Sequence, residues 1–120
     1  MQNKPGYSIF KNAWYAFSGV VTAFRTETSF KLEIFFGIWI FAAIFWLDLP
    51  FDARLILSVT ALLIPIVELL NSAIENLVDL VTREYHPLAK NAKDMGAAAV
   101  LLAVLLHLGC WAAILTEVYA

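Results

Sequence analysis

One otherwise apolar stretch of the sequence carries acidic and amide side chains at helical spacing: Glu68, Asn71, Glu75 and Asp79. On a helix these positions share a stripe about 80° wide, because successive residues turn by about 100°. Ionisable groups are costly to expose to lipid, so in a membrane helix they normally face a bundle interior or water and mark a functional site. The alternative is a polar seam that only fixes helix packing or oligomer register.

Further charged residues are expected to meet this stripe at one face of the membrane. Counted from Arg54, a rise of about 1.5 Å per residue puts Glu68 roughly 21 Å and Glu75 roughly 31 Å along the helix, near the far boundary of a hydrocarbon core about 30 Å thick. Carboxylates and a lysine at that boundary suit Mg²⁺-nucleotide chemistry on a lipid headgroup, since Mg²⁺ prefers few carboxylates plus phosphate oxygens. The converging set is Glu27, Glu33, Glu68, Asn71, Glu75, Lys93 and Asp94.

The composition of the 120 residues is that of a membrane protein. Hydrophobic residues make up 62% and charged residues 15% of the chain, against about 45–50% and about 25% in soluble domains. A single cysteine, Cys110, excludes an intrachain disulfide scaffold. A net charge of −2 without a run of Lys or Arg argues against a nucleic-acid partner. No cleaved signal peptide is expected from the first thirty residues.

The helices that must position these side chains are predicted as spans of about 30–49, 54–82 and 93–118. Residues 95–116 contain no Lys, Arg, Asp or Glu, and residues 34–51 contain only Asp48. Pro50 is expected to separate the first two spans, and Pro87 with the polar stretch 90–94 to separate the last two. The fold class is therefore an all-α membrane protein with three transmembrane helices, in a single domain over 1–120.

The segment at about 7–25 is predicted to be an amphipathic surface helix. Trp14, Phe17 and Phe24 fall on one helical face, and Lys11 and Arg25 on the opposite face, which is typical of a helix on the inner membrane surface. The alternative is a helix packed against the bundle. Four basic residues precede the first span, one lies in the first loop, three in the second and none in the tail, so the N-terminus is expected in the cytoplasm.

Conventional nucleotide and metal motifs are missing from the sequence. It contains no P-loop, no kinase-type glycine loop, no H-E-x-x-H and no C-x-x-C, so any nucleotide site must be unconventional. His86 is expected to be a polar group in a loop. His107 is expected to pack or hydrogen-bond within the last span rather than to bind metal.

Several strings in the sequence together resemble the small integral-membrane prokaryotic diacylglycerol kinases. They are E-L-L-N-S-A-I-E at 68–75 with Asp79, E-Y-H at 84–86, A-K-D-M-G-A-A-A-V at 92–100, and Glu27 with Phe30 and Glu33. The combination is specific, and the likeness covers nearly the whole chain. The resemblance implies a homotrimeric bundle in the bacterial inner membrane with sites shared between chains, using ATP and Mg²⁺ to convert diacylglycerol into phosphatidic acid.

The same resemblance implies a role for each matching residue. Glu68 would be the general base, Asn71 an essential organiser beside it, and Glu27 and Glu75 the magnesium ligands. The ATP contacts would be Tyr15, Glu27, Glu75, Glu84, Tyr85, His86, Lys93 and Asp94. The lipid contacts would be Ser29, Phe30, Lys31, Leu32, Glu33, Trp46, Leu47, Asp48, Leu49, Arg54, Glu68, Ala97 and Trp111. Trp46 and Trp111 have the alternative role of aromatic anchors at the membrane interface.

Other functions stay open at this stage. An undecaprenol kinase of the same family would share the catalytic residues, so these cannot separate the two substrates. Ser8 and Leu32 stand where the best-known members carry arginine and glutamine, which could broaden lipid selectivity. A proton-coupled multidrug exporter subunit has similar length but is expected to have four spans with an acid in the first. A structural oligomer subunit would leave Glu27, Lys93 and Asp94 without a role.

Overall fold

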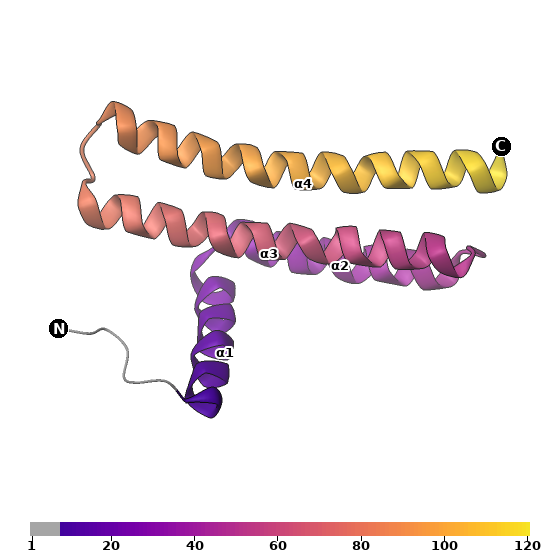
Figure 1. The fold of residues 1–120 in the computed structure, drawn as a ribbon, viewed down its shortest axis with the longest axis horizontal. Coiled ribbons are helices and arrows are strands. Elements are labelled where there is room, and N and C mark those ends of the chain that lie inside the picture. The colour runs from indigo at the N-terminus through magenta and orange to yellow at the C-terminus, as the bar shows by residue number, and fades with distance from the viewer. Residues whose placement is uncertain (1–7) are drawn as a thin grey trace.

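The computed structural model describes residues 8–120, which form four helices (Figure 1). They are α1 (Ile9–Thr26), α2 (Thr28–Trp46), α3 (Phe51–Val81) and α4 (Pro87–Tyr119), and this part of the chain contains no strand. The helices α2, α3 and α4 are long and apolar enough to cross a membrane. The predicted all-α class with three spans and an N-terminal helix is confirmed. The predicted start of the first helix at residue 7 lies outside the described residues.

The N-terminal helix α1 extends sideways from the three long helices (Figure 1). Its first turn is capped by Ser8, whose Oγ accepts a hydrogen bond from the backbone N–H of Lys11 over 3.5 Å. Ala23 is the only buried residue of α1, whereas the large side chains of Phe10 and Trp14 are exposed. The apolar face of α1 is therefore free to lie on a membrane, which favours the surface helix over one packed against the bundle.

The end of the bundle where α2 passes into α3, here called the Pro50 end, is closed by an apolar cluster and an arginine. Arg54 donates from Nε to the carbonyl of Ile44 over 3.1 Å and from Nη2 to that of Leu47 over 2.7 Å. These bonds satisfy carbonyls that the last turn of α2 would otherwise leave unpaired. The buried cluster of Ile44, Leu49, Ala53 and Leu57 packs against side chains of α4, among them Trp111 and Ile114.

The opposite end, here called the Pro87 end, differs from the sequence prediction. The last helix begins at Pro87 rather than at about 93, so the polar stretch 90–94 is helical and not a loop. Proline suits the first helical position because the N–H it lacks would have no partner there. His86 caps the helix, since its Nδ1 accepts a hydrogen bond from the backbone N–H of Leu88 over 3.1 Å. Lys93 and Asp94 are consequently held on a rigid backbone.

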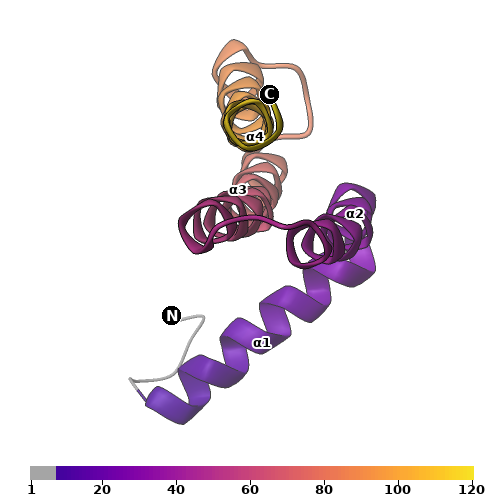
Figure 2. The same ribbon diagram turned by 90° about the vertical axis from the view of Figure 1, so that its right-hand side faces the viewer.

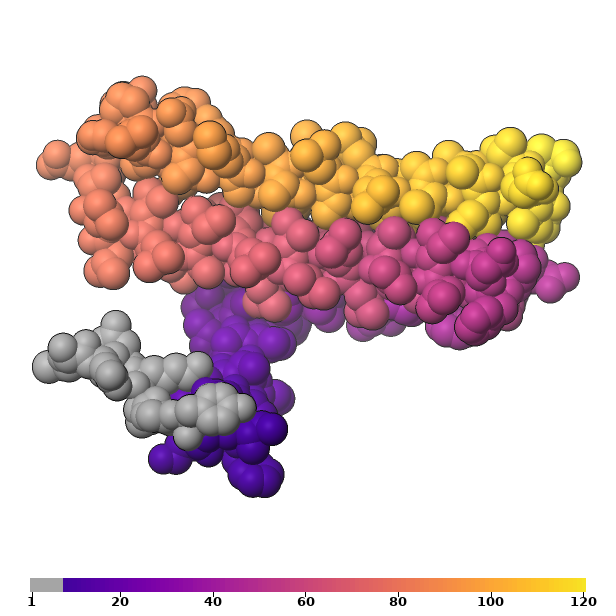
Figure 3. Space-filling model, viewed as in Figure 1, coloured from indigo at the N-terminus to yellow at the C-terminus, as the bar shows by residue number. Residues whose placement is uncertain are grey.

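The three long helices form an open arrangement rather than a closed bundle. Viewed end-on, α3 has α2 and α4 as separate neighbours (Figure 2), and α4 follows α3 along most of its length (Figure 3). Many large apolar side chains of α2 and α4 stay exposed, including Phe36, Trp39, Leu102 and Leu106. Such surfaces suit lipid or neighbouring chains.

Candidate active site

The polar stripe of α3 faces the other helices. Glu68 is 5% exposed and Asn71 is 7% exposed, while Glu75 and Asp79 are half-buried nearer the Pro87 end. Asn71 donates from Nδ2 to Glu75 Oε1 over 3.2 Å, which links the amide and the carboxylate one turn apart. The helical spacing seen in the sequence thus produces a line of polar groups from the buried Glu68 toward the half-buried Asp79 near the Pro87 end.

The carboxylate of Glu68 is held from α2. Ser29 donates from Oγ to Glu68 Oε1 over 2.8 Å, a bond between residues 39 positions apart. Glu33, one turn further along α2, interacts with Glu68 through its own carboxyl group. Glu68 is placed to accept a proton from a hydroxyl group.

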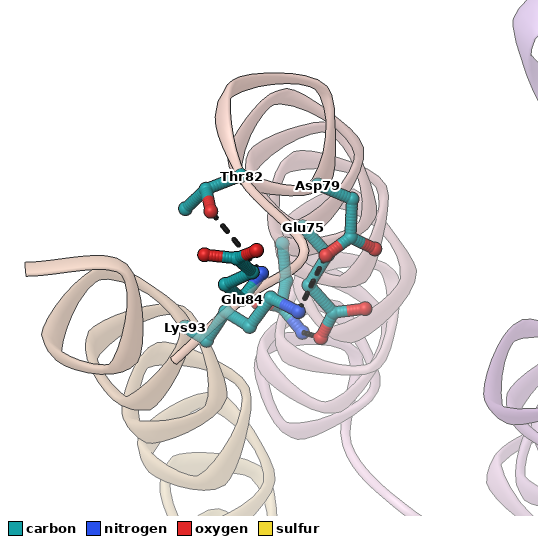
Figure 4. A network of polar contacts seen from close by, with 6 residues as sticks. Glu75, Asp79, Thr82, Glu84 and Lys93 are labelled. Carbon is teal, nitrogen blue, oxygen red and sulfur yellow. Dashed lines mark hydrogen bonds and ion pairs between the residues drawn. The ribbon is translucent and has the colours of Figure 1, made fainter. Parts of the chain in front are cut away.

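An ion pair connects α4 to the stripe. Lys93 Nζ lies 2.7 Å from Asp79 Oδ1, and the two side chains are 42% and 35% exposed. Figure 4 shows Lys93 reaching from α4 toward Asp79, with Glu75 on the same side of α3. The pair is open enough to water for the ammonium group to meet a ligand. A lysine so placed can balance the charge of a phosphate.

A pocket of about 380 Å³ lies beside this ion pair, where α3 passes into α4. Its volume falls in the range of small-molecule sites. The predicted nucleotide residues that line it are Glu84, Tyr85, His86, Lys93 and Asp94. Thr82 shapes the connection, since its Oγ1 accepts a hydrogen bond from the backbone N–H of Glu84 over 3.1 Å (Figure 4). Asp94 is also paired with Lys90 over 2.6 Å.

Three nucleotide candidates lie outside this pocket: Glu75 on α3, and Tyr15 and Glu27 near the N-terminal helix. Tyr15 and Glu27 line a pocket of about 660 Å³ between α1 and α3, together with Ser72 and Asn76. Glu27 occupies the junction where α1 ends and α2 begins. In one chain seven of the eight predicted ATP contacts therefore fall into two groups that line different pockets, and Glu75 lines neither pocket.

The predicted lipid contacts also separate into two groups. Ser29 and Glu33 meet Glu68, and Lys31, Leu32 and Ala97 are exposed, whereas Phe30 is buried in the core. The other group, Trp46, Leu47, Asp48, Leu49, Arg54 and Trp111, lies toward the Pro50 end. A helical rise of about 1.5 Å per residue sets Trp46 about 25 Å from Ser29. One headgroup cannot touch both groups, and several of the distant residues make structural contacts: Leu49 is core and Arg54 caps α2.

A polar network joins α3 and α4 in the half of these helices nearer the Pro50 end, here called the Pro50 half, and it was only partly expected from the sequence. His107, 2% exposed, accepts at Nε2 a hydrogen bond from Trp111 Nε1 over 2.9 Å, and its Nδ1 lies 2.8 Å from Thr60 Oγ1. Since Trp can only donate, Nδ1 carries the ring proton and donates it to Thr60. Thr60 in turn donates to the carbonyl of Ile56 over 2.9 Å. His107 hydrogen-bonds within the span as predicted, but its partner Thr60 was not foreseen.

The donor groups near Asn71 fit a magnesium ion that arrives with a nucleotide. Within residues 8–120 no group of three or more His, Cys, Asp or Glu side chains is arranged to hold a metal by itself. Mg²⁺ is commonly held by one or two carboxylates together with substrate phosphates, which does not require such a group. Glu75 supplies one carboxylate, and Ser72, which lines the same pocket as Glu27, has a buried Oγ without a hydrogen-bond partner.

The chain is similar over most of its length to proteins named diacylglycerol kinase. A sequence family described as prokaryotic diacylglycerol kinase matches residues 14–115, a range that includes every candidate residue from Tyr15 to Trp111. The diacylglycerol kinase of Escherichia coli K12 is 39% identical over 117 residues, covering 94% of this chain and 93% of the relative. That of Pseudomonas aeruginosa is 44% identical over 101 residues, covering 84% and 82%. That of Synechocystis is 42% identical over 117 residues, covering 86% and 67%.

Proposed function

Because this chain belongs to the prokaryotic diacylglycerol kinase family, we propose that it transfers the γ-phosphoryl group of ATP to the free hydroxyl of diacylglycerol, releasing ADP and phosphatidic acid. The observation that carries this proposal is the buried carboxylate of Glu68. It accepts a hydrogen bond from Ser29 and belongs to a polar stripe that ends beside a pocket of about 380 Å³. A lipid hydroxyl and a nucleotide can approach this line of groups from opposite ends.

The reaction is proposed to take place at the cytoplasmic face of the bacterial inner membrane. The Pro87 end carries Arg83, Lys90 and Lys93, whereas the Pro50 end carries only Arg54. Cytoplasmic segments are enriched in Lys and Arg, so the Pro87 end and the N-terminus belong inside. ATP is supplied on that side.

Glu68 is proposed to be the general base. As the lipid hydroxyl oxygen attacks the γ-phosphorus, Glu68 accepts the hydroxyl proton, the new P–O bond forms and the bond from the γ-phosphorus to the β–γ bridging oxygen breaks. The hydrogen bond from Ser29 would hold the Glu68 carboxylate in place for this proton transfer. A well-placed general base contributes about 10² to 10⁴ in rate.

The nucleotide is proposed to bind at the Pro87 end of α3 and α4. Glu27 and Glu75 would hold the Mg²⁺ of ATP, with Asn71 organising Glu75 through its hydrogen bond. When bound, Mg²⁺ neutralises charge on the phosphate oxygens. Lys93 would balance the remaining phosphate charge, and the residues Glu84, Tyr85 and His86 with Asp94 would contact the rest of the nucleotide.

A homotrimer with shared sites accounts for the two separate groups of nucleotide candidates. Tyr15 and Glu27 of one chain would complete the pocket formed by residues 84–86, Lys93 and Asp94 of its neighbour. The open arrangement of α2, α3 and α4 leaves apolar surface for such neighbours. Membrane helices associate through close packing and hydrogen bonds, which these surfaces allow.

The lipid is proposed to place its glycerol at Glu68 and its acyl chains along the bundle. Ser29, Lys31, Leu32, Glu33 and Ala97 would surround the glycerol and its hydroxyl group. The Pro50-end residues, about 25 Å away, would contact acyl chains only. Diacylglycerol is preferred over undecaprenol because the relatives that match most of the chain are named for it.

Transfer of radiolabelled phosphate from ATP to a lipid panel in bilayers tests this proposal. With dioleoylglycerol the label should appear in phosphatidic acid, at a higher initial rate than with undecaprenol at equal mole fraction. A higher rate with undecaprenol would be consistent with the same mechanism but would make undecaprenol, not diacylglycerol, the substrate. Absence of transfer to every lipid, by protein shown to be folded, would refute the kinase function.

A further inference from the structure

Gly96 of α4 lies directly against the amide of Asn71 on α3. Gly96 is buried, and a Cβ atom placed on it would overlap Asn71 Oδ1 and lie 3.2 Å from Asn71 Cγ. The other glycines of the described chain, Gly19, Gly37 and Gly109, have nothing within 4 Å of the equivalent position. Among these four glycines, only Gly96 has a polar atom of another helix in the space that a side chain would occupy.

The Asn71 amide has one hydrogen bond and one oxygen without a partner. Its Nδ2 donates to Glu75 Oε1, whereas Oδ1 is buried and accepts no hydrogen bond. The terminal torsion of asparagine is intrinsically broad, so the side chain does not fix the direction of its own amide. Because the amide is planar, holding Oδ1 in the space at Gly96 also directs Nδ2 toward Glu75.

We propose that Gly96 is a positioning residue for this reaction: its missing side chain forms a notch that holds the Asn71 amide in the orientation that supports Glu75. The inference rests on the proposed function, in which Glu75 holds magnesium with the nucleotide. A side chain at position 96 would push Oδ1 out and turn Nδ2 away from Glu75. Groups that orient a metal ligand typically affect metal affinity or activity by about 10- to 100-fold.

A purely structural reason for the glycine makes a different prediction. Small residues let membrane helices approach closely, so a methyl group at a crossing point can simply loosen the contact. In that case Gly96→Ala would lower stability without altering the magnesium dependence of the remaining activity. A positioning role instead raises the magnesium requirement and lowers kcat while leaving the KM for diacylglycerol unchanged, since Asn71 does not contact the lipid in this account.

The experiment compares Gly96→Ala with Gly109→Ala, the same substitution in the same helix at a position with open space around it. Both changes favour helix formation, so neither should unfold α4. For Gly96→Ala, the Mg²⁺ concentration for half-maximal activity should rise and kcat should fall. The product of the two fold-changes should be about 10 to 100. Gly109→Ala should match the wild type. A wild-type magnesium dependence and kcat in Gly96→Ala would overturn the proposal.

A measurement on the wild-type protein covers the case in which Gly96→Ala does not fold. With ¹⁵N-labelled asparagine, the side-chain NH₂ resonance of Asn71 should show restricted motion without nucleotide, in contrast to the exposed Asn91. An Asn71 amide as mobile as that of Asn91 would overturn the proposal. Restricted motion in a protein that phosphorylates no lipid would retain the notch and refute the proposed function instead.

Discussion

Polar side chains are buried both in the Pro50 half of α3 and α4 and in the half nearer the Pro87 end, here called the Pro87 half. The two halves differ in whether these side chains have hydrogen-bond partners. In the Pro50 half, the hydrogen-bonding groups of Thr60, His107 and Trp111 are all paired with one another or with backbone. In the Pro87 half, side-chain oxygens of Asn71 and Ser72 are buried without partners, as is Glu33 Oε2 on α2. Buried polar groups without partners are unusual in folded proteins.

This difference separates a structural network from a candidate active site within one pair of helices. A fully paired network holds the helices together and has no capacity left for a ligand. Unpaired oxygens next to carboxylates retain that capacity. The basic side chains of the two halves differ in the same way. Arg54 donates its hydrogen bonds to carbonyls at the end of α2, whereas Lys93 lines a pocket. A polar side chain in a membrane helix therefore indicates a functional site only when its hydrogen-bonding groups are not already paired within the protein.

Glu68→Gln should have the largest effect and tests the Pro87 half. The amide keeps the shape of the side chain but cannot accept the hydroxyl proton, so kcat should fall by about 10² to 10⁴. Binding of ATP and assembly of the protein should persist. Steady-state turnover and nucleotide binding by the purified variant are the measurements, with Glu117→Gln at the Pro50 end as the matched control. Near-normal turnover of Glu68→Gln would remove Glu68 from the role of base.

Glu27→Gln and Glu75→Gln should each raise the magnesium requirement or lower activity by at least about 10- to 100-fold, the loss typical for a group that only orients a metal ligand. If the two carboxylates of a site come from different chains, mixing the two single variants should regenerate some intact sites and recover activity. The measurement is turnover after co-expression of the two variants. No recovery, despite demonstrated exchange of subunits, would assign both ligands to one chain.

Asp79→Asn should have a smaller effect, because it removes one side of a partly exposed ion pair. Such pairs contribute about 0.2 to 1 kcal/mol, so the KM for ATP should change by no more than about fivefold as Lys93 loses its anchor. The KM for ATP at constant Mg²⁺ is the quantity to measure. Lys90→Gln, which breaks the exposed pair with Asp94, provides a comparison on the same helix. A loss of kcat as large as that of Glu68→Gln would instead give Asp79 a direct role in the chemistry.

Thr60→Val should leave turnover unchanged and reduce stability, since it removes a partner of His107 in the Pro50 half. Interhelical hydrogen bonds in membrane proteins contribute about 0.6 kcal/mol on average and up to about 1.7 kcal/mol. Reversible unfolding in mixed micelles, paired with kcat, checks both parts. A tenfold loss of kcat at normal stability would contradict the division between the two halves.

The positions of the stripe and of the spans could be predicted because they depend on local periodicity. Glu68, Asn71 and Glu75 share one face of a helix regardless of what that helix packs against. The membrane spans are indicated by the length of the apolar segments alone. The start of the last helix was misplaced, because the polar stretch 90–94 looks like a loop although Pro87 and the His86 cap begin the helix before it.

Contacts between helices could not be predicted in the same way. The partners Thr60 and His107 lie 47 positions apart, and the notch at Gly96 depends on how closely α4 crosses α3. Both depend on the relative rotation and height of two helices, which periodicity within one helix does not determine. The separation of the nucleotide candidates into two pockets has the same origin.

The side of the membrane on which ATP is consumed shows whether the chemistry takes place in the Pro87 half alone. The protein is reconstituted into sealed vesicles that contain diacylglycerol, and vesicles of one orientation are selected by an affinity tag after Ala120. Mg²⁺-ATP is then supplied on one side only. Phosphatidic acid should form only when ATP is on the side opposite the C-terminal tag, which is the side of residues 82–86. Formation of product from ATP on the same side as the tag would place the nucleotide site at the Pro50 end instead.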